Sequence, residues 1–98
     1  MDEVEENHLI LGVAHHVRVA LADALEHLVS GIVDHPEDVR VSSRSMRRGQ
    51  MLEVRVNPED LGRVIGRGGR TARALRTVVN ALSPRGNVRV DVVDTDRE

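Results

Sequence analysis

The sequence lacks several residue types, and each absence excludes a class of structure or function. It has no cysteine, so a disulfide framework and a thiolate metal site are both excluded. It has no phenylalanine, tyrosine or tryptophan, so its core must be aliphatic and nucleobases would find no aromatic ring to stack on. No run approaches the roughly 20 apolar residues of a membrane span, and the start is acidic where a signal peptide would be basic. We expect a soluble, cytoplasmic protein.

Charge of both signs is present but unevenly distributed along the 98 residues, a length that predicts one domain. Residues 1–39 hold nine acidic residues and one arginine, a net charge of −8. Residues 40–76 hold ten arginines and three acidic residues, a net charge of +7, and the chain has no lysine. This basic middle segment predicts a localised anion-binding face. A solvated surface of mixed charge would give the same composition.

Hydrophobic periodicity predicts an α+β domain over residues 19–94. Apolar residues at three- and four-residue steps, such as Leu21, Leu25 and Val29, indicate a first helix that ends near His35, because Pro36 disfavours its continuation. The other predicted elements are strands at 39–42, 52–56 and 88–92, a short helix from Pro58 to Ile65 capped by Asn57, and a helix over 71–82 with an apolar stripe of Ala72, Leu75, Val79 and Leu82. Three strands that bury one face against three helices form two layers. Residues 1–18 are an acidic extension, partly disordered or continuing the first helix, and 95–98 are a polar tail.

Three glycines between the two later helices form the most informative segment. Gly66, Gly68 and Gly69 suit a sharp turn because glycine accepts positive φ, and they leave no side chain to hold a ligand away. The turn leads into a helix N-terminus, where free N–H groups and the helix dipole favour an anion. Arginines at 63, 67 and 70 lie in or beside it. Gly62, one turn earlier, is interpreted as a close-packing position.

Other glycine motifs fit this segment less well. A P-loop needs glycine five residues before Gly69, where the sequence has Val64, and a lysine where it has Arg70. A dinucleotide-binding fingerprint needs glycine or alanine at Thr71 and a strand directly before the loop. Here a helix precedes the loop, so both interpretations fail.

Residues 64–71, Val-Ile-Gly-Arg-Gly-Gly-Arg-Thr, resemble the KH signature, an aliphatic pair followed by a G-x-x-G loop between two helices. With the helix and strand placed before it, the order α-β-β-α-α-β is similar to a type II KH domain. Together with 52–56 and 58–66, the segment looks most like the small bacterial single-KH proteins of the KhpA group. Residues 1–18 lie outside this resemblance and could be a longer first helix, a partner arm or an artefact of an early start codon.

The resemblance implies that the loop clamps the backbone of about four unpaired nucleotides. It implies apolar contacts to the bases from Ile65, with Val64 and Leu75 as further candidates. It also implies a second basic border in the loop 43–50. The candidate RNA-binding residues are thus Gly66, Arg67, Gly68, Gly69, Arg63, Arg70, Ile65, Arg44, Arg47 and Arg48.

The resemblance further implies a bacterial RNA chaperone or post-transcriptional regulator that forms a homodimer and pairs with a KhpB-type KH protein. The alternative is a protein-interaction module that kept the fold and lost RNA affinity. No nucleophile–base pair, metal cluster or nucleotide loop is present in the sequence, so we expect no enzyme activity, no metal site and no cofactor.

Overall fold

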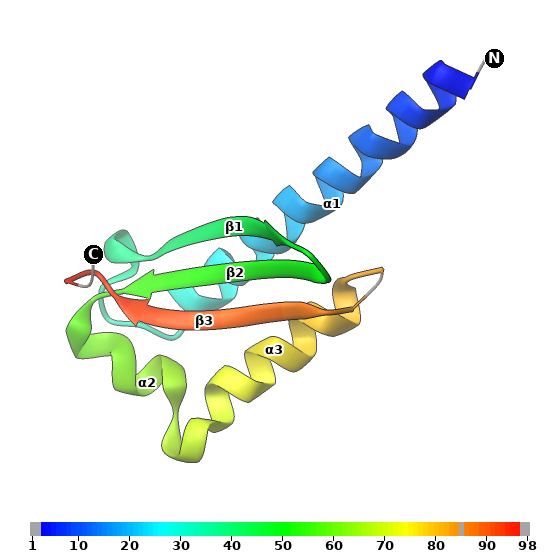
Figure 1. The fold of residues 1–98 in the computed structure, drawn as a ribbon. Helices are drawn as coiled ribbons and strands as arrows, with labels where there is room; N and C mark the ends of the chain where they lie inside the picture. Colours follow the sequence, from blue (N-terminus) through cyan, green and yellow to red (C-terminus); the bar gives the residue numbers. More distant parts are fainter. Residues whose placement is uncertain (1–2, 85, 97–98) are drawn as a thin grey trace.

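The structure is a computed structural model, and it describes residues 3–84 and 86–96 (Figure 1). The helices and strands follow the order predicted from the sequence. They are α1 (Glu3–Ser30), β1 (Arg40–Met46), β2 (Gly49–Val56), α2 (Leu61–Ile65), α3 (Arg70–Leu82) and β3 (Val88–Asp94). Short 3₁₀ turns at Pro36–Asp38, Pro58–Asp60 and Arg67–Gly69 precede β1, α2 and α3. The arrangement confirms the type II KH architecture, an α+β domain with three helices and one sheet.

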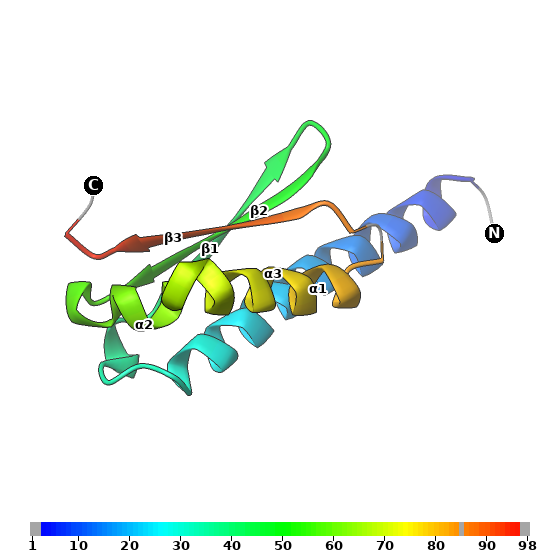
Figure 2. The ribbon, with the colours of Figure 1, turned by 90° about the horizontal axis from the view of Figure 1, so that it is seen from below.

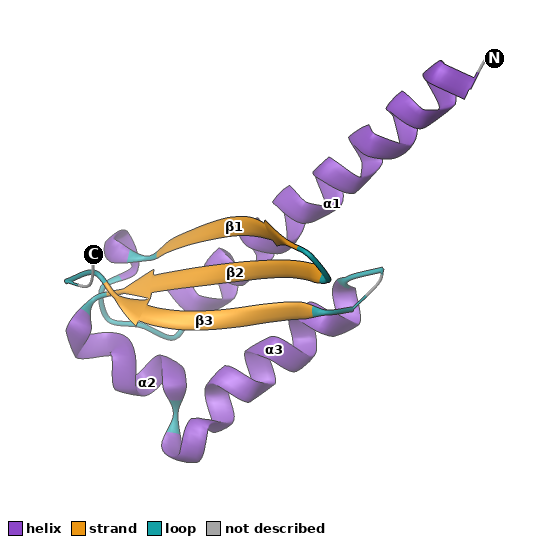
Figure 3. Ribbon diagram, viewed as in Figure 1, coloured by secondary structure: helices purple, strands orange, loops and turns teal. Residues whose placement is uncertain are grey.

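The sheet has the order β1-β2-β3, with β2 in the centre (Figure 3). β1 pairs with β2 antiparallel, as a hairpin requires, and β3 pairs with β2 parallel. A parallel pair needs a long crossover, and α2 and α3 supply it. Along β2 the side chains alternate, so that Gln50, Leu52, Val54 and Val56 face the helices and are buried.

The core lies between this inner face of the sheet and the helices, which Figure 2 shows as two layers. Leu25 and Val29 of α1 are fully buried, and Leu75 and Val79 of α3 meet the same cluster. Each such aliphatic side chain contributes roughly 1.5–3 kcal/mol by leaving water. The core therefore fixes α3, and with it the loop at the N-terminus of α3, against the sheet.

α1 includes most of the segment 1–18, one of the two alternatives for that segment, and it ends earlier than the sequence predicted. Its backbone is helical from Glu3, and its N-terminal part extends past the sheet (Figure 1). It stops at Ser30 instead of near His35, because the N–H of Gly31 donates to the carbonyls of both His27 and Leu28 and the chain then turns. Among the residues that the structure describes, no helix is long and apolar enough to cross a membrane.

Two further predictions were wrong. The segment 43–50 was expected to be a loop, but β1 continues to Met46 and β2 begins at Gly49, because backbone pairing persists almost to the turn. Leu82 was placed in the apolar stripe of α3, yet it is 57% exposed, and Val78 on the same side is 44% exposed. In the last turn of α3, Val79 enters the core and Asn80 bonds the backbone of Val88, whereas the side chains at 78 and 82 stay at the surface.

Candidate functional site

The glycine loop begins where α2 ends, and α2 begins as the sequence predicted. Asn57 caps the turn Pro58–Asp60, because its side-chain oxygen accepts from the N–H of Glu59 at 2.9 Å. The amide nitrogen of Asn57 donates to the carboxylate of Asp38 at 2.9 Å, which holds this cap against the segment before β1. After five residues α2 ends at Ile65, and Gly66 follows with a φ of +79°. The short helix thus delivers the chain directly into the loop.

Gly66 has a structural role in the loop. A Cβ on Gly66 would lie 2.8 Å from the backbone nitrogen of Thr71 and closer still to the Thr71 hydroxyl, so the turn closes tightly on the first residues of α3. Its N–H donates to the carbonyl of Gly62 at 2.9 Å, and its carbonyl accepts from the N–H of Gly69 at 3.1 Å. Only glycine fits both the φ and the space, so this residue sets the bend between α2 and α3.

The space beside Gly68 and Gly69 is unoccupied, whereas the space beside Gly66 is filled by Thr71. Both have positive φ, +63° and +75°, and no atom lies within 4 Å of a Cβ built on either residue. The outer side of the loop is therefore bare backbone, and another chain can approach it without meeting a side chain. Gly62 is also unobstructed: outside its own helix, no atom lies within 4 Å of a Cβ built on this residue, so the close-packing interpretation of Gly62 was wrong.

The arginines around the loop divide into two that are engaged and two that are free. Arg63 pairs with Asp34 at 2.9 Å, and Arg73 donates to the carbonyl of Gly68 at 2.8 Å and so braces the loop from α3. Arg67 and Arg70 are exposed and make no hydrogen bond or ion pair within 3–84 and 86–96. Two unengaged guanidinium groups thus lie beside the bare backbone, at the start of a helix that has no side-chain cap.

The apolar surface available to bases beside the loop is smaller than the resemblance implied. Ile65 is 36% exposed and presents surface next to Gly66. Val64 is fully buried and Leu75 is 8% exposed, so both belong to the core.

The hairpin arginines lie at the other end of α3 from the glycine loop (Figure 1). Arg47 and Arg48 form the turn between β1 and β2, and Arg44 lies on β1 opposite Met51. The hairpin end is docked on the loop before β3: the N–H of Gln50 donates to the carbonyl of Asn87 at 3.2 Å, and a Cβ on Gly49 would collide with that carbonyl. The structure does not bring the two basic segments face to face, and α3 separates them by its length, roughly 20 Å.

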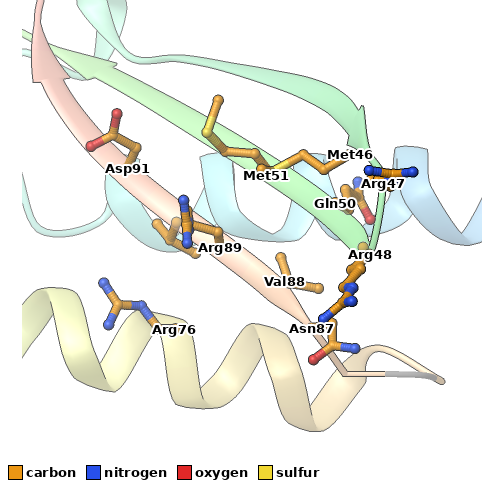
Figure 4. Close-up of a pocket in the computed structure, with 12 residues that line it drawn as sticks. Met46, Arg47, Arg48, Gln50, Met51, Arg76, Asn87, Val88, Arg89 and Asp91 are labelled. Atoms are coloured by element: carbon orange, nitrogen blue, oxygen red, sulfur yellow. The ribbon is translucent and has the colours of Figure 1, made fainter.

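An open depression of about 800 Å³ lies beside the hairpin turn (Figure 4). Arg47 and Arg48 line it together with Arg76 of α3 and Arg89 of β3. Arg89 was not among the RNA-binding residues predicted from the sequence. The strict alternation of 88–92 already pointed its side chain outward, but only the strand register shows that it neighbours Met51.

A buried carboxylate, Asp60, ties α2 to the segment after α1. Asp60 is 1% exposed and accepts from the backbone N–H groups of Asp34 at 3.1 Å and His35 at 3.0 Å. The Nδ1 atom of the His35 ring lies 3.2 Å from the same carboxylate. In the sequence, Asp60 lies in the first turn of the helix predicted from Pro58, and His35 lies near the predicted end of the first helix. Their 25-residue separation leaves no local signal of the contact.

Both members of this pair have shifted pKa values. Burial raises the pKa of Asp60, but the N–H groups of Asp34 and His35 and the His35 ring outweigh it, so the pKa lies below the ordinary 3.8. The hydrogen bond to Asp60 raises the pKa of His35 above 6.5, against the opposing effect of desolvation, and the charges of Asp60, Glu59 and Glu37 add to the increase. The pair is an internal brace for α2, because all its contacts lie within the fold.

Comparison with known proteins gives one consistent family. The model of the family described as "KhpA/KhpB, KH domain" matches residues 22–93. A protein named RNA-binding protein KhpA from Streptomyces coelicolor is 71% identical over 76 residues, which is 78% of this chain and 95% of that protein. Proteins of the same name from Leifsonia xyli subsp. xyli and Mycobacterium tuberculosis are 72% and 64% identical, over 76% and 79% of this chain and 97% and 95% of those proteins.

No solved structure gives a significant match to the chain. The family match covers the sheet, the glycine loop and all of α2 and α3. The fold, the helix–loop–helix geometry and these relatives agree, and the chain belongs to the KhpA/KhpB family of KH-domain proteins.

Proposed function

We propose that the chain binds single-stranded RNA through the loop Gly66–Gly69, as an RNA chaperone or post-transcriptional regulator in the bacterial cytoplasm. The observation that carries this proposal is the bare outer side of Gly68 and Gly69, flanked by the free guanidinium groups of Arg67 and Arg70. The KhpA relatives, which are named RNA-binding proteins, support it.

The geometry suits an unpaired sugar–phosphate backbone. A phosphate can approach the glycines closely and accept hydrogen bonds from N–H groups at the first turn of α3, where the helix dipole adds a favourable field. Arg67 and Arg70 supply charge and forked donors to the same or neighbouring phosphates. KH loops of this type hold about four nucleotides, with bases splayed away from the loop. Ile65 offers the adjoining apolar surface.

The direct test is fluorescence anisotropy with a labelled RNA of about six unpaired nucleotides, titrated at several salt concentrations. Three or four phosphate contacts predict a slope of log K against log salt of about −2 to −3 for a single strand. A duplex of the same length serves as the control. It should bind more weakly, because base pairing fixes the course of each backbone and prevents it from following the loop. Absence of binding at low salt, or equal binding of duplex and single strand, would contradict the proposal.

We also propose that the chain self-associates and pairs with a KhpB-type KH protein. The exposed Val78 and Leu82 on one side of α3 support a protein contact there, because such apolar side chains gain free energy when covered. Light scattering should give twice the 10.8 kDa mass of one chain. Leu82→Arg should return the mass to that of a monomer. Thr77→Arg, which introduces the same side chain on another side of α3, should leave the dimer intact. A dimer that binds no RNA would instead favour the alternative, a protein-interaction module.

A further inference from the structure

The outer face of the sheet carries a second group of arginines, away from the glycine loop. The strand register aligns Arg44, Met51 and Arg89 in one row across all three strands. The hairpin turn adds Arg47 and Arg48, and Arg76 reaches this region from α3 (Figure 4). We call these residues the sheet patch: Arg44, Arg47, Arg48, Arg76 and Arg89 with Met46 and Met51.

The arginines of the sheet patch are not neutralised within the described part of the chain. None of the five makes an ion pair or hydrogen bond with another residue of 3–84 or 86–96. Two rows further along the same face, by contrast, Arg55 donates to Glu53 at 2.9 Å. One acidic residue, Asp91, lines the depression. Four of these cations line the depression beside this single carboxylate, and Arg44 lies opposite Met51, which also lines it. Together they create a field that favours an anionic ligand.

The floor of the depression is apolar and polarisable. Met46 is 42% exposed, and Met51 contributes a half-buried thioether from the central strand. In a chain without aromatic residues, thioethers and planar guanidinium groups are the side chains that can pack against the face of a base. Asp91 can accept from a base amino group, and it would repel a phosphate at that point. The depression therefore combines surfaces for bases with charges for phosphates.

We propose that the sheet patch holds further nucleotides of the same RNA strand whose backbone the glycine loop grips. The inference rests on the proposed function, and it lengthens the RNA footprint beyond the roughly four nucleotides of one KH loop. Arg76 lies seven residues after Gly69 on α3, so the strand would run about 10 Å along this helix to reach the first cation of the patch. The ligand is single-stranded RNA, because flexible unpaired nucleotides can follow the turn from the loop to the sheet.

The test compares RNAs of about 5 and about 10 unpaired nucleotides by anisotropy, with the full-length chain and with Arg89→Glu. A longer RNA also offers more binding registers, but this statistical gain is the same for both proteins and cancels in the comparison. We expect the gain in affinity from the longer RNA to be roughly fivefold larger for the unsubstituted chain than for Arg89→Glu. Affinity for the short RNA should differ less than about twofold between them, since one distant charge is largely screened.

Arg40→Glu is the matched control, because Arg40 lies on the same face of β1 at its other end. It should leave the gain in affinity unchanged. An equal gain in Arg89→Glu and the unsubstituted chain would overturn the sheet patch while leaving the glycine loop intact. The same loss in Arg40→Glu and Arg89→Glu would also overturn it, since general surface charge would then explain the effect. Failure of the unsubstituted chain to bind the short RNA would refute the proposed function itself.

Discussion

A double variant, Arg67→Asp with Gly68→Asp, should lose RNA affinity by at least about 100-fold while remaining folded. Two charge-assisted contacts, each contributing roughly 1.5–3 kcal/mol, would be removed, and two carboxylates would face the phosphates. The fold should tolerate both changes, because Arg67 is exposed and no atom lies within 4 Å of a Cβ on Gly68. Aspartate is also among the residues that accept a positive φ most readily.

Anisotropy with the short RNA measures this loss, and circular dichroism checks the fold. Arg40→Asp is the control: it reverses one charge on the outer face of the sheet, away from the loop, and should keep most of the affinity. A folded double variant that binds RNA as tightly as the unsubstituted chain would refute the assignment of the site to Gly66–Gly69.

Asp60→Ala should produce the second large effect, a fall in Tm on the order of 10 °C. The substitution removes the shared acceptor of two backbone N–H groups and one ring nitrogen, and leaves these partly buried groups without the carboxylate that they contact. Glu59→Ala deletes the same charge one residue earlier from a side chain that is 78% exposed, and it should change Tm by only a few degrees. Equal, small effects of the two variants would show that the Asp60 brace contributes little.

The same pair predicts how stability depends on pH. The raised pKa of His35 gives a stabilisation that is complete below 6.5 and is lost as the pH rises through the raised value. The lowered pKa of Asp60 gives one that is present above 3.8 and is lost as the pH falls through the lowered value. Thermal melts between these limits should therefore show the largest difference between Asp60→Ala and the unsubstituted chain, and the difference should shrink above the pKa of His35.

Local patterns were sufficient to predict most of the fold. The alternation in 52–56 placed β2, and Asn57-Pro58 marked the start of the turn into α2, because both signals act between neighbours in the chain. The glycines at 66, 68 and 69 located the loop for the same reason. Sequence spacing could not separate their roles, because the space that a side chain at position 66 would need is taken by Thr71, and this depends on the angle between α2 and α3.

Long-range geometry accounts for what the sequence did not reveal. The buried contact between Asp60 and His35 joins residues 25 positions apart, and neither residue type indicates it. The hairpin arginines were expected across a groove from the glycine loop, but the docking of Gln50 on Asn87 places them near the C-terminal end of α3. That Arg89 lies beside them follows only from the register of β3 against β2, which the sequence does not reveal.

The parallel pairing of β2 and β3 also bears on the order in which the domain is completed. The connection between these strands is the segment 57–87, which contains the glycine loop, so β3 can dock only after both crossover helices have been made. The β1–β2 hairpin can form early from local contacts, whereas the parallel edge must wait for distant ones. During synthesis the glycine loop, the proposed RNA-binding site, would therefore be fixed against the complete sheet only after β3 has been made.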